Sequence, residues 1–255
     1  SGPTVYLTAT ERTKIQSGFS STIIQPDRTL ALTSLVLNTP LVVNAGNIYM
    51  METINTKDNN VTFNMGKEGV SFCLLDAVID TTGTFQINQG AESGLIYFGP
   101  LLSEQSATIN GGLGTTVLIS EGADNIWNIT GDNSGGLNDL ITFINVDALH
   151  GGSGSNDTFI FSNGATLSGN VEGGGGEGIL DYTDWVTPVL INLENSLAKN
   201  LGEPYEAISS IIGNVEFVSY LGYLEAEKAV QTAFTYPYPY HLHISYHTPT
   251  YGKHN

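Results

Sequence analysis

Five oxygen-bearing side chains in or near glycine-rich turns are candidates for binding a hard cation: Asp124, Asp132, Asn156, Asp157 and Asp181. Calcium binds about six to eight oxygen atoms from carboxylates, backbone carbonyls and water. Glycine-rich turns let carbonyls from neighbouring segments converge on one ion. The competing interpretation is that these Asp and Asn side chains accept hydrogen bonds from local N–H groups in β-turns. The residue types therefore predict calcium as a candidate cofactor, with turn capping as the alternative.

The distribution of charge is a second reason to consider cations. The chain holds 16 acidic residues from Glu68 to Glu194, and no Lys or Arg occurs between positions 68 and 198. Salt bridges within this stretch therefore cannot balance the carboxylates. They must be solvated, held by backbone N–H groups or neutralised by bound cations.

A second constellation suggests an enzyme that acts on polysaccharides. Asp181 and Asp184 lie beside Tyr182 and Trp185. A lyase or hydrolase needs carboxylates as acid and base, and the two aromatic rings could stack on sugars. A lyase of this kind also needs a Lys or Arg near the developing carbanion, which this stretch lacks. A repeat spacer with Leu180 pointing inward is the competing interpretation, so the enzyme is the alternative function.

The C-terminal tail contains a third candidate site. His241 and His243 would project from the same face of a strand and could bind Zn²⁺ or Ni²⁺. No Cys or acidic residue lies nearby, which disfavours a closed structural zinc site.

Composition excludes several classes of protein. The 255 residues are 13% charged and carry a formal net charge of −17. Such a chain would repel nucleic acid and anionic lipid, and no run of 18 apolar residues predicts a membrane helix. The single Cys73 lies in an apolar run and reads as a small core residue.

The elements that must position these residues are almost all strands. Apolar and polar residues alternate over residues 61–65, 85–87, 159–161 and 189–193, between turn-forming residues. Helical patterns are rare: the strongest covers Tyr223–Phe234, and a weaker one covers Leu197–Leu201.

Internal repeats in the sequence favour a stack of repeated units over other β folds. The segment from Ile141 to Leu149 and the segment from Ile208 to Val218 both contain Ile-x-x-Ile followed by Val-acid-x-aliphatic, with one residue between the two parts in the first segment and three in the second. Repeated units of this kind stack because none of them buries its apolar face alone. The sequence therefore predicts a parallel β-solenoid, with a β-sandwich as the structural alternative for the first 110 residues.

Two glycine-rich segments resemble a known family. Gly151–Phe159 and Gly173–Tyr182 are similar to degenerate RTX-type nonapeptides, Gly-Gly-x-Gly-x-Asp-x-apolar-x. Together with the surrounding phrases, they make residues 120–218 similar to the RTX-like and haemagglutinin-like repeats of large secreted bacterial surface proteins. The resemblance implies calcium between the turns of a parallel β-roll. The chain departs from the pattern: the first copy has one extra residue, so either Asn156 or Asp157 stands at the ligand position, and Gly178 stands at the Asp position of the second copy.

These observations combine into one expectation. The chain is predicted to be an all-β parallel solenoid of roughly ten turns, with a solenoid-like part over 1–110, a repeat part over 111–221, and a helix plus tail over 222–255. The predicted function is a non-enzymatic, extracellular or cell-surface bacterial protein, either an adhesin segment or a self-assembling fibre subunit. Its expected partners are copies of itself, stacked head to tail, or a surface glycan or protein receptor.

Overall fold

The structure is a computed structural model of the 255-residue chain. It describes residues 4–6, 22–24, 29–32, 35–37, 40–51, 53–66, 70–76, 78–99, 106–121 and 124–218. The helix predicted over Tyr223–Phe234, the tail over 235–255 and the histidines of that tail lie outside the described residues.

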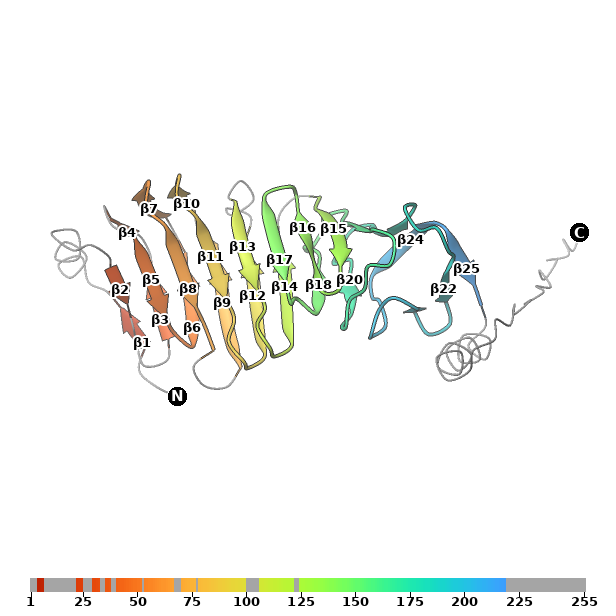
Figure 1. Cartoon of the computed structure of the whole chain (residues 1–255), viewed down its shortest axis with the longest axis horizontal. Coiled ribbons are helices and arrows are strands. Elements are labelled where there is room, and N and C mark those ends of the chain that lie inside the picture. Colours follow the sequence, from red (N-terminus) through yellow and green to blue (C-terminus); the bar gives the residue numbers. More distant parts are fainter. Residues whose placement is uncertain are drawn as a thin grey trace, which may run out of the picture.

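Four β-sheets make up the described part of the chain, which contains no α-helix (Figure 1). The eight-stranded sheet has the spatial order β1 (Thr4–Tyr6), β3 (Thr29–Leu32), β6 (Asn47–Met50), β9 (Ser71–Leu75), β12 (Gly94–Phe98), β14 (Thr116–Ser120), β18 (Ala148–His150) and β20 (Val171–Glu172). The eleven-stranded sheet has the order β2 (Thr22–Ile24), β5 (Leu41–Asn44), β8 (Val61–Asn64), β11 (Phe85–Asn88), β13 (Ala107–Asn110), β17 (Ile141–Ile144), β16 (Ser134–Leu137), β15 (Ile126–Gly131), β19 (Thr158–Phe161), β21 (Gly178–Tyr182) and β24 (Ile208–Gly213). Two three-stranded sheets have the orders β10 (Val78–Thr81), β7 (Thr53–Lys57), β4 (Leu35–Val36) and β23 (Leu197–Ala198), β22 (Val189–Asn192), β25 (Val215–Phe217).

Pairing within the sheets is largely parallel, and the chain alternates between the two long sheets as it advances along the molecule. The all-β prediction is confirmed, and the predicted strands at 61–65, 85–87, 159–161 and 189–193 appear as β8, β11, β19 and β22. Both long sheets continue across position 110, because β12 pairs with β14 and β13 pairs with β17. No helix among the described residues is long and apolar enough to cross a membrane.

The core consists of apolar side chains stacked in columns between the sheets. One column of the eight-stranded sheet aligns Ile48, Cys73, Ile96, Leu118 and Leu149, and all five are fully buried. The alternating burial along each strand follows from the two-residue period of a β-strand. Burial also raises the pKa of the Cys73 thiol, in keeping with the predicted core role of this residue.

A ladder of asparagines lies at the ends of four parallel strands of the eleven-stranded sheet, at the corner where the chain leaves this sheet. Asn44, Asn64, Asn88 and Asn110 align at the ends of β5, β8, β11 and β13. The Asn64 Nδ2 donates to Asn44 Oδ1 at 2.8 Å, and the Asn88 Nδ2 donates to Asn64 Oδ1 at 2.9 Å. Identical amides stacked at the strand spacing satisfy one another, as in other in-register parallel arrays. The ladder therefore links β5, β8 and β11 in register, while Asn110 Oδ1 accepts from Asn145 Nδ2 at 3.0 Å.

An antiparallel meander interrupts the parallel order of the eleven-stranded sheet. Strand β16 pairs antiparallel with both β15 and β17, and β17 lies next to β13 although β15 comes first in the chain. The turns are tight because Asn133, Asn138 and Asp139 adopt positive φ. The meander places two extra strands in the eleven-stranded sheet, whereas β14 and β18 pair directly in the other sheet.

The weaker helix prediction, over Leu197–Leu201, is wrong. Leu197 and Ala198 form β23, which pairs antiparallel with β22 after a turn in which Ser196 has a φ of 52°. Five residues are too few to sustain a helix without strong packing, so the pairing with β22 decides the conformation.

Candidate functional site

Three of the five predicted cation ligands lie at one corner of the stack, where Asp157 is fully buried. Asp157 lies at the end of the glycine-rich turn between β18 and β19. Its Oδ1 accepts hydrogen bonds from the backbone N–H of Asn125 at 3.1 Å and from Asn125 Nδ2 at 2.7 Å. Its Oδ2 accepts from the Gly152 N–H at 3.0 Å and from Ser155 Oγ at 2.8 Å. Four protein donors thus satisfy both oxygens of a buried carboxylate.

This arrangement joins two layers of the stack. Asn125 immediately precedes β15, Asp157 immediately precedes β19, and the two strands pair in parallel. A buried carboxylate is tolerated only where hydrogen bonds replace the water it has lost. The chain supplies these bonds from its own backbone and amide groups, so the side chain acts as a clamp between neighbouring layers.

Two more predicted ligands lie at the same corner. The Asn156 N–H donates to Asp124 Oδ1 at 2.8 Å, and the Glu177 N–H donates to Asn156 Oδ1 at 2.9 Å. Side chains at successive layers therefore accept from the backbone of the next layer. The structure brings Asp124, Asn156 and Asp157 together in this way.

The other two predicted ligands have their contacts in other turns. Asp132 accepts a hydrogen bond from Thr166 Oγ1 at 2.7 Å, and Asp181 accepts one from the Thr183 N–H at 2.8 Å. Within the described ranges, no group of three or more His, Cys, Asp or Glu side chains could hold a metal ion. The structure thus divides the five predicted ligands among separate turns.

The sequence analysis missed two further carboxylates that bind neighbouring layers. Asp147 Oδ2 accepts from the Thr116 N–H at 2.7 Å, and Asp147 Oδ1 accepts from Ser168 Oγ. Glu121 Oε2 accepts from the N–H and the Oγ of Ser153, at 3.0 and 2.8 Å. The partners are 21 to 32 positions apart, on either side of the acidic residue, so no local spacing marks them. These contacts explain how part of the acidic stretch is accommodated without Lys or Arg.

Calcium binding by Asp124, Asp132, Asn156, Asp157 and Asp181 stays a prediction, and its test is thermal unfolding of the chain in EDTA and in millimolar CaCl₂. Since Asp157 is already saturated by protein donors, we expect the two midpoints to agree within about 2 °C. Equal midpoints would mean that no calcium ion binds the folded chain tightly enough to stabilise it. A rise of more than about 5 °C in CaCl₂, absent in MgCl₂, would instead show a calcium ion built into the fold.

Two of the four residues predicted to form an enzyme site, Tyr182 and Trp185, pack against the core. Tyr182 is fully buried, its ring stacks on Phe161 with centroids 5.2 Å apart, and its hydroxyl donates to Asn200 Oδ1 at 2.9 Å. Trp185 packs edge-on against the same ring, with centroids 6.0 Å apart. The expectation that Tyr182 stacks on a sugar is therefore wrong, because its ring belongs to the core.

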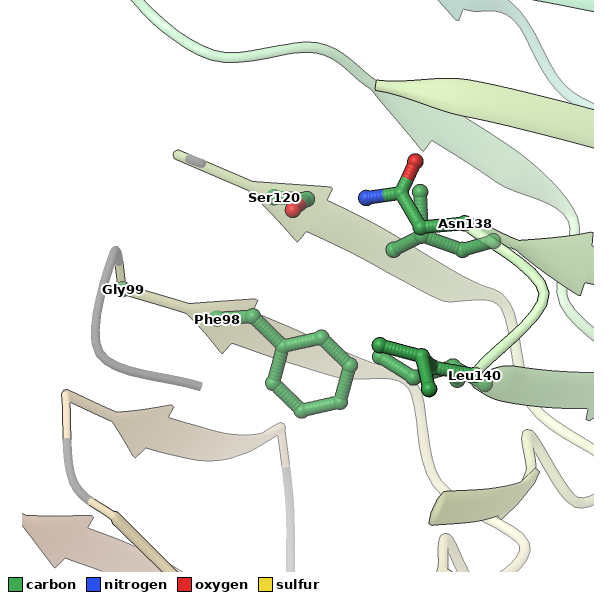
Figure 2. A pocket seen from close by; sticks show the side chains of 7 residues that line it. Phe98, Gly99, Ser120, Asn138 and Leu140 are labelled. Carbon is green, nitrogen blue, oxygen red and sulfur yellow. The ribbon is translucent and has the colours of Figure 1, made fainter. Parts of the chain in front are cut away.

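A hollow beneath the meander is too small for a substrate (Figure 2). Phe98 and Ser120, at the ends of β12 and β14, face Asn138 and Leu140 of the turn between β16 and β17. The enclosed volume is about 10 Å³. A space of this size holds at most one water molecule.

The outer face of the eight-stranded sheet carries a contiguous apolar surface. Seven partly exposed side chains, here called the apolar strip, project from β6, β9, β12 and β14: Tyr49, Phe72, Leu74, Leu95, Tyr97, Val117 and Ile119. The register aligns Tyr49, Leu74, Tyr97 and Ile119 in one column, beside a second column that begins at Phe72. At about 4.8 Å per strand, the strip runs for roughly 15 Å along the molecule.

Polar and charged groups border the strip. Its first column continues into His150, whose Nδ1 lies 3.3 Å from Glu172 Oε2. Burial, and then the charges of Glu121 and Asp76, raise the pKa of the Tyr97 hydroxyl. The strip is therefore an uncharged surface with acidic groups close to one side.

The outer face of the eleven-stranded sheet is chemically different. At the corresponding outward positions Thr62, Gln86, Thr108 and Thr142 align across β8, β11, β13 and β17. Both faces have the same strand geometry, so the geometry does not require apolar residues on one of them. An apolar patch that the fold does not require is typical of an interaction surface.

Comparisons with protein-family models, with curated protein sequences and with solved structures found no match to the chain.

Proposed function

We propose that the chain is a β-solenoid rod that serves as a non-enzymatic structural or adhesive element outside a bacterial cell. Successive strands pair in parallel 20 and 24 positions apart at the asparagine ladder, which supports repeated coils around one core. A β-sandwich would instead be built mainly from antiparallel strands. The clamps at Asp157, Asp147 and Glu121 support the same architecture, because each one joins adjacent layers.

The apolar strip is the observation that carries the functional part of the proposal. A sheet surface of adjacent apolar side chains suits association with another extended surface better than it suits chemistry on a small molecule. The strip faces outward on four adjacent strands held in register by the core beneath. It is thus a rigid contact surface for a receptor or for a second copy of the chain.

Two matched variants test the contact surface. Leu74→Glu places a charge in the centre of the strip, whereas Thr62→Glu places the same charge on the outer face of the other long sheet. We expect Leu74→Glu to shorten retention on octyl-agarose markedly and Thr62→Glu to leave it near that of the unmodified chain, because only the first substitution interrupts the apolar surface. Equal retention of the two variants would remove the strip as a contact surface.

Sedimentation velocity at low and high salt then separates the two partners. Copies with a net charge of −17 repel each other, so self-association through the strip should strengthen with added salt and weaken roughly tenfold or more in Leu74→Glu. A chain that stays monomeric at every salt concentration but retains strip-dependent adsorption would point to a receptor. A chain with neither behaviour would contradict the proposal.

A further inference from the structure

The eleven-stranded sheet ends at β24 with an incompletely covered core. Figure 1 shows β24 and β25 at one end of the described part of the molecule. One inward column aligns Trp127, Phe159, Leu180 and Ile211; the first three are fully buried, whereas Ile211, on the last strand, is only partly buried. The small sheet repeats the pattern: Ile191 is fully buried, but its partner Phe217 on β25 is 47% exposed.

Ile211 and Phe217 line an open hollow at this end. Its volume is about 150 Å³, and with two serines of β24 it is lined by Leu193, Tyr205, Ile208, Ile211 and Phe217. Those five apolar residues are here called the end face. Strands β24 and β25 are also the last strands of their sheets among the described residues. Natural proteins cover an apolar surface bounded by open strand edges with a helix or a loop.

The chain itself supplies a segment of suitable chemistry next to the end face. Val218 is buried, and its N–H donates to the Ile191 carbonyl at 2.9 Å, so the chain leaves β25 beside the hollow. The next residues, 219–234, include the strongest helical pattern of the sequence, over Tyr223–Phe234. On a helical projection most of its apolar residues fall on one side, namely Tyr223, Ala226, Ala229, Val230, Ala233 and Phe234. Glu225, Lys228, Gln231 and Thr232 fall on the other side together with Leu224, and Glu227 lies at the border.

The length of the predicted helix also agrees with the length of the strands that it would cover. A helix of 12 residues is about 18 Å long, and a five-residue strand such as β21 is about 17 Å long. We propose that residues 219–234 of the same chain cover the end face, with the apolar side of the segment against Ile211 and Phe217. This inference rests on the open end of the core and on the sequence that follows it, and it holds whatever the rod binds through the apolar strip.

Hydrogen exchange of the full chain tests this cover with two matched substitutions. Val230→Glu introduces a charge on the apolar side of the segment, and Thr232→Glu introduces the same charge on its polar side. We expect Val230→Glu to speed amide exchange in β24 and β25 by roughly tenfold or more, because uncovered strands open more easily. Thr232→Glu should leave these rates unchanged. Peptides covering β9 and β12 serve as the internal reference, since exchange there reports on the body of the fold.

The dependence of β24 amide protection on protein concentration distinguishes cover by the same chain from cover by a second copy of the chain. Protection of β24 that is the same at roughly tenfold different protein concentrations supports cover by the same chain. Protection that grows with concentration, together with a dimer in sedimentation velocity, would show that a second copy covers the end face and would overturn the proposal. Equal exchange rates in Val230→Glu, Thr232→Glu and the unmodified chain would overturn it as well.

Discussion

Replacing Asp157 by alanine is expected to lower the free energy of unfolding by about 3–5 kcal/mol. The substitution removes the acceptor for four donors: the N–H groups of Asn125 and Gly152, Asn125 Nδ2 and Ser155 Oγ. Asp157 is fully buried, so water cannot replace the carboxylate without opening the corner. Each unsatisfied buried donor costs about 1–3 kcal/mol, with partial relief from relaxation.

Asp124→Ala is the matched control for this prediction. Asp124 belongs to the same corner and also accepts a backbone hydrogen bond, from Asn156, but its side chain is exposed. Water takes over such a contact, so we expect a loss below about 1 kcal/mol. Urea unfolding followed by far-UV circular dichroism measures both values. Similar losses for the two variants would mean that burial of Asp157 is not what gives the clamp its strength.

The clamp also shows where sequence reasoning stops. The sequence gives two competing roles for an Asp in a glycine-rich turn, calcium ligand or hydrogen-bond acceptor, and local chemistry allows both. The N–H groups that saturate Asp157 include those of Asn125, 32 positions away in the chain. Only the stacking of β15 on β19 brings the two residues together, and no local pattern encodes that stacking.

Strand positions, in contrast, follow directly from local pattern. The alternation of apolar and polar residues predicts β8, β11, β19 and β22, because one side of each strand must face the core. The antiparallel meander of β15, β16 and β17 was not predictable in this way. A strand has the same two-residue period in both directions, so the period does not reveal which neighbour it pairs with or in which sense.

A repeat in the first half of the chain was readable but was missed. The pattern apolar-x-apolar-Asn-x-Gly occurs at residues 41–46, 61–66, 85–90 and 107–112. Its copies begin 20, 24 and 22 residues apart, so a search for a constant period passes over it. The structure shows that the shared Asn forms the ladder. The shared Gly closes the adjoining corner, and at Gly112 its role can be tested.

Replacing Gly112 by alanine is expected to lower the free energy of unfolding by about 3–5 kcal/mol. Gly112 has a φ of 77°, which L-residues rarely adopt, and a Cβ built there would lie 2.0 Å from the carbonyl oxygen of Gly90 in the preceding layer. That oxygen also accepts a hydrogen bond from the Leu113 N–H at 3.2 Å. The added methyl group must therefore push two layers apart at the asparagine corner.

Gly154→Ala separates the cost of the backbone conformation from the cost of the close approach. Gly154 has a φ of 89°, but a Cβ there would meet no atom within 4 Å. Its loss should be only the conformational term of about 1 kcal/mol, which urea unfolding resolves from the larger loss at Gly112. If both variants lose the same small amount, the layers at Gly112 have room to separate, and tight stacking at this corner does not stabilise the fold. A clearly larger loss at Gly112 than at Gly154 means that the approach of the two backbones, more than the turn conformation, requires glycine at the end of the repeat.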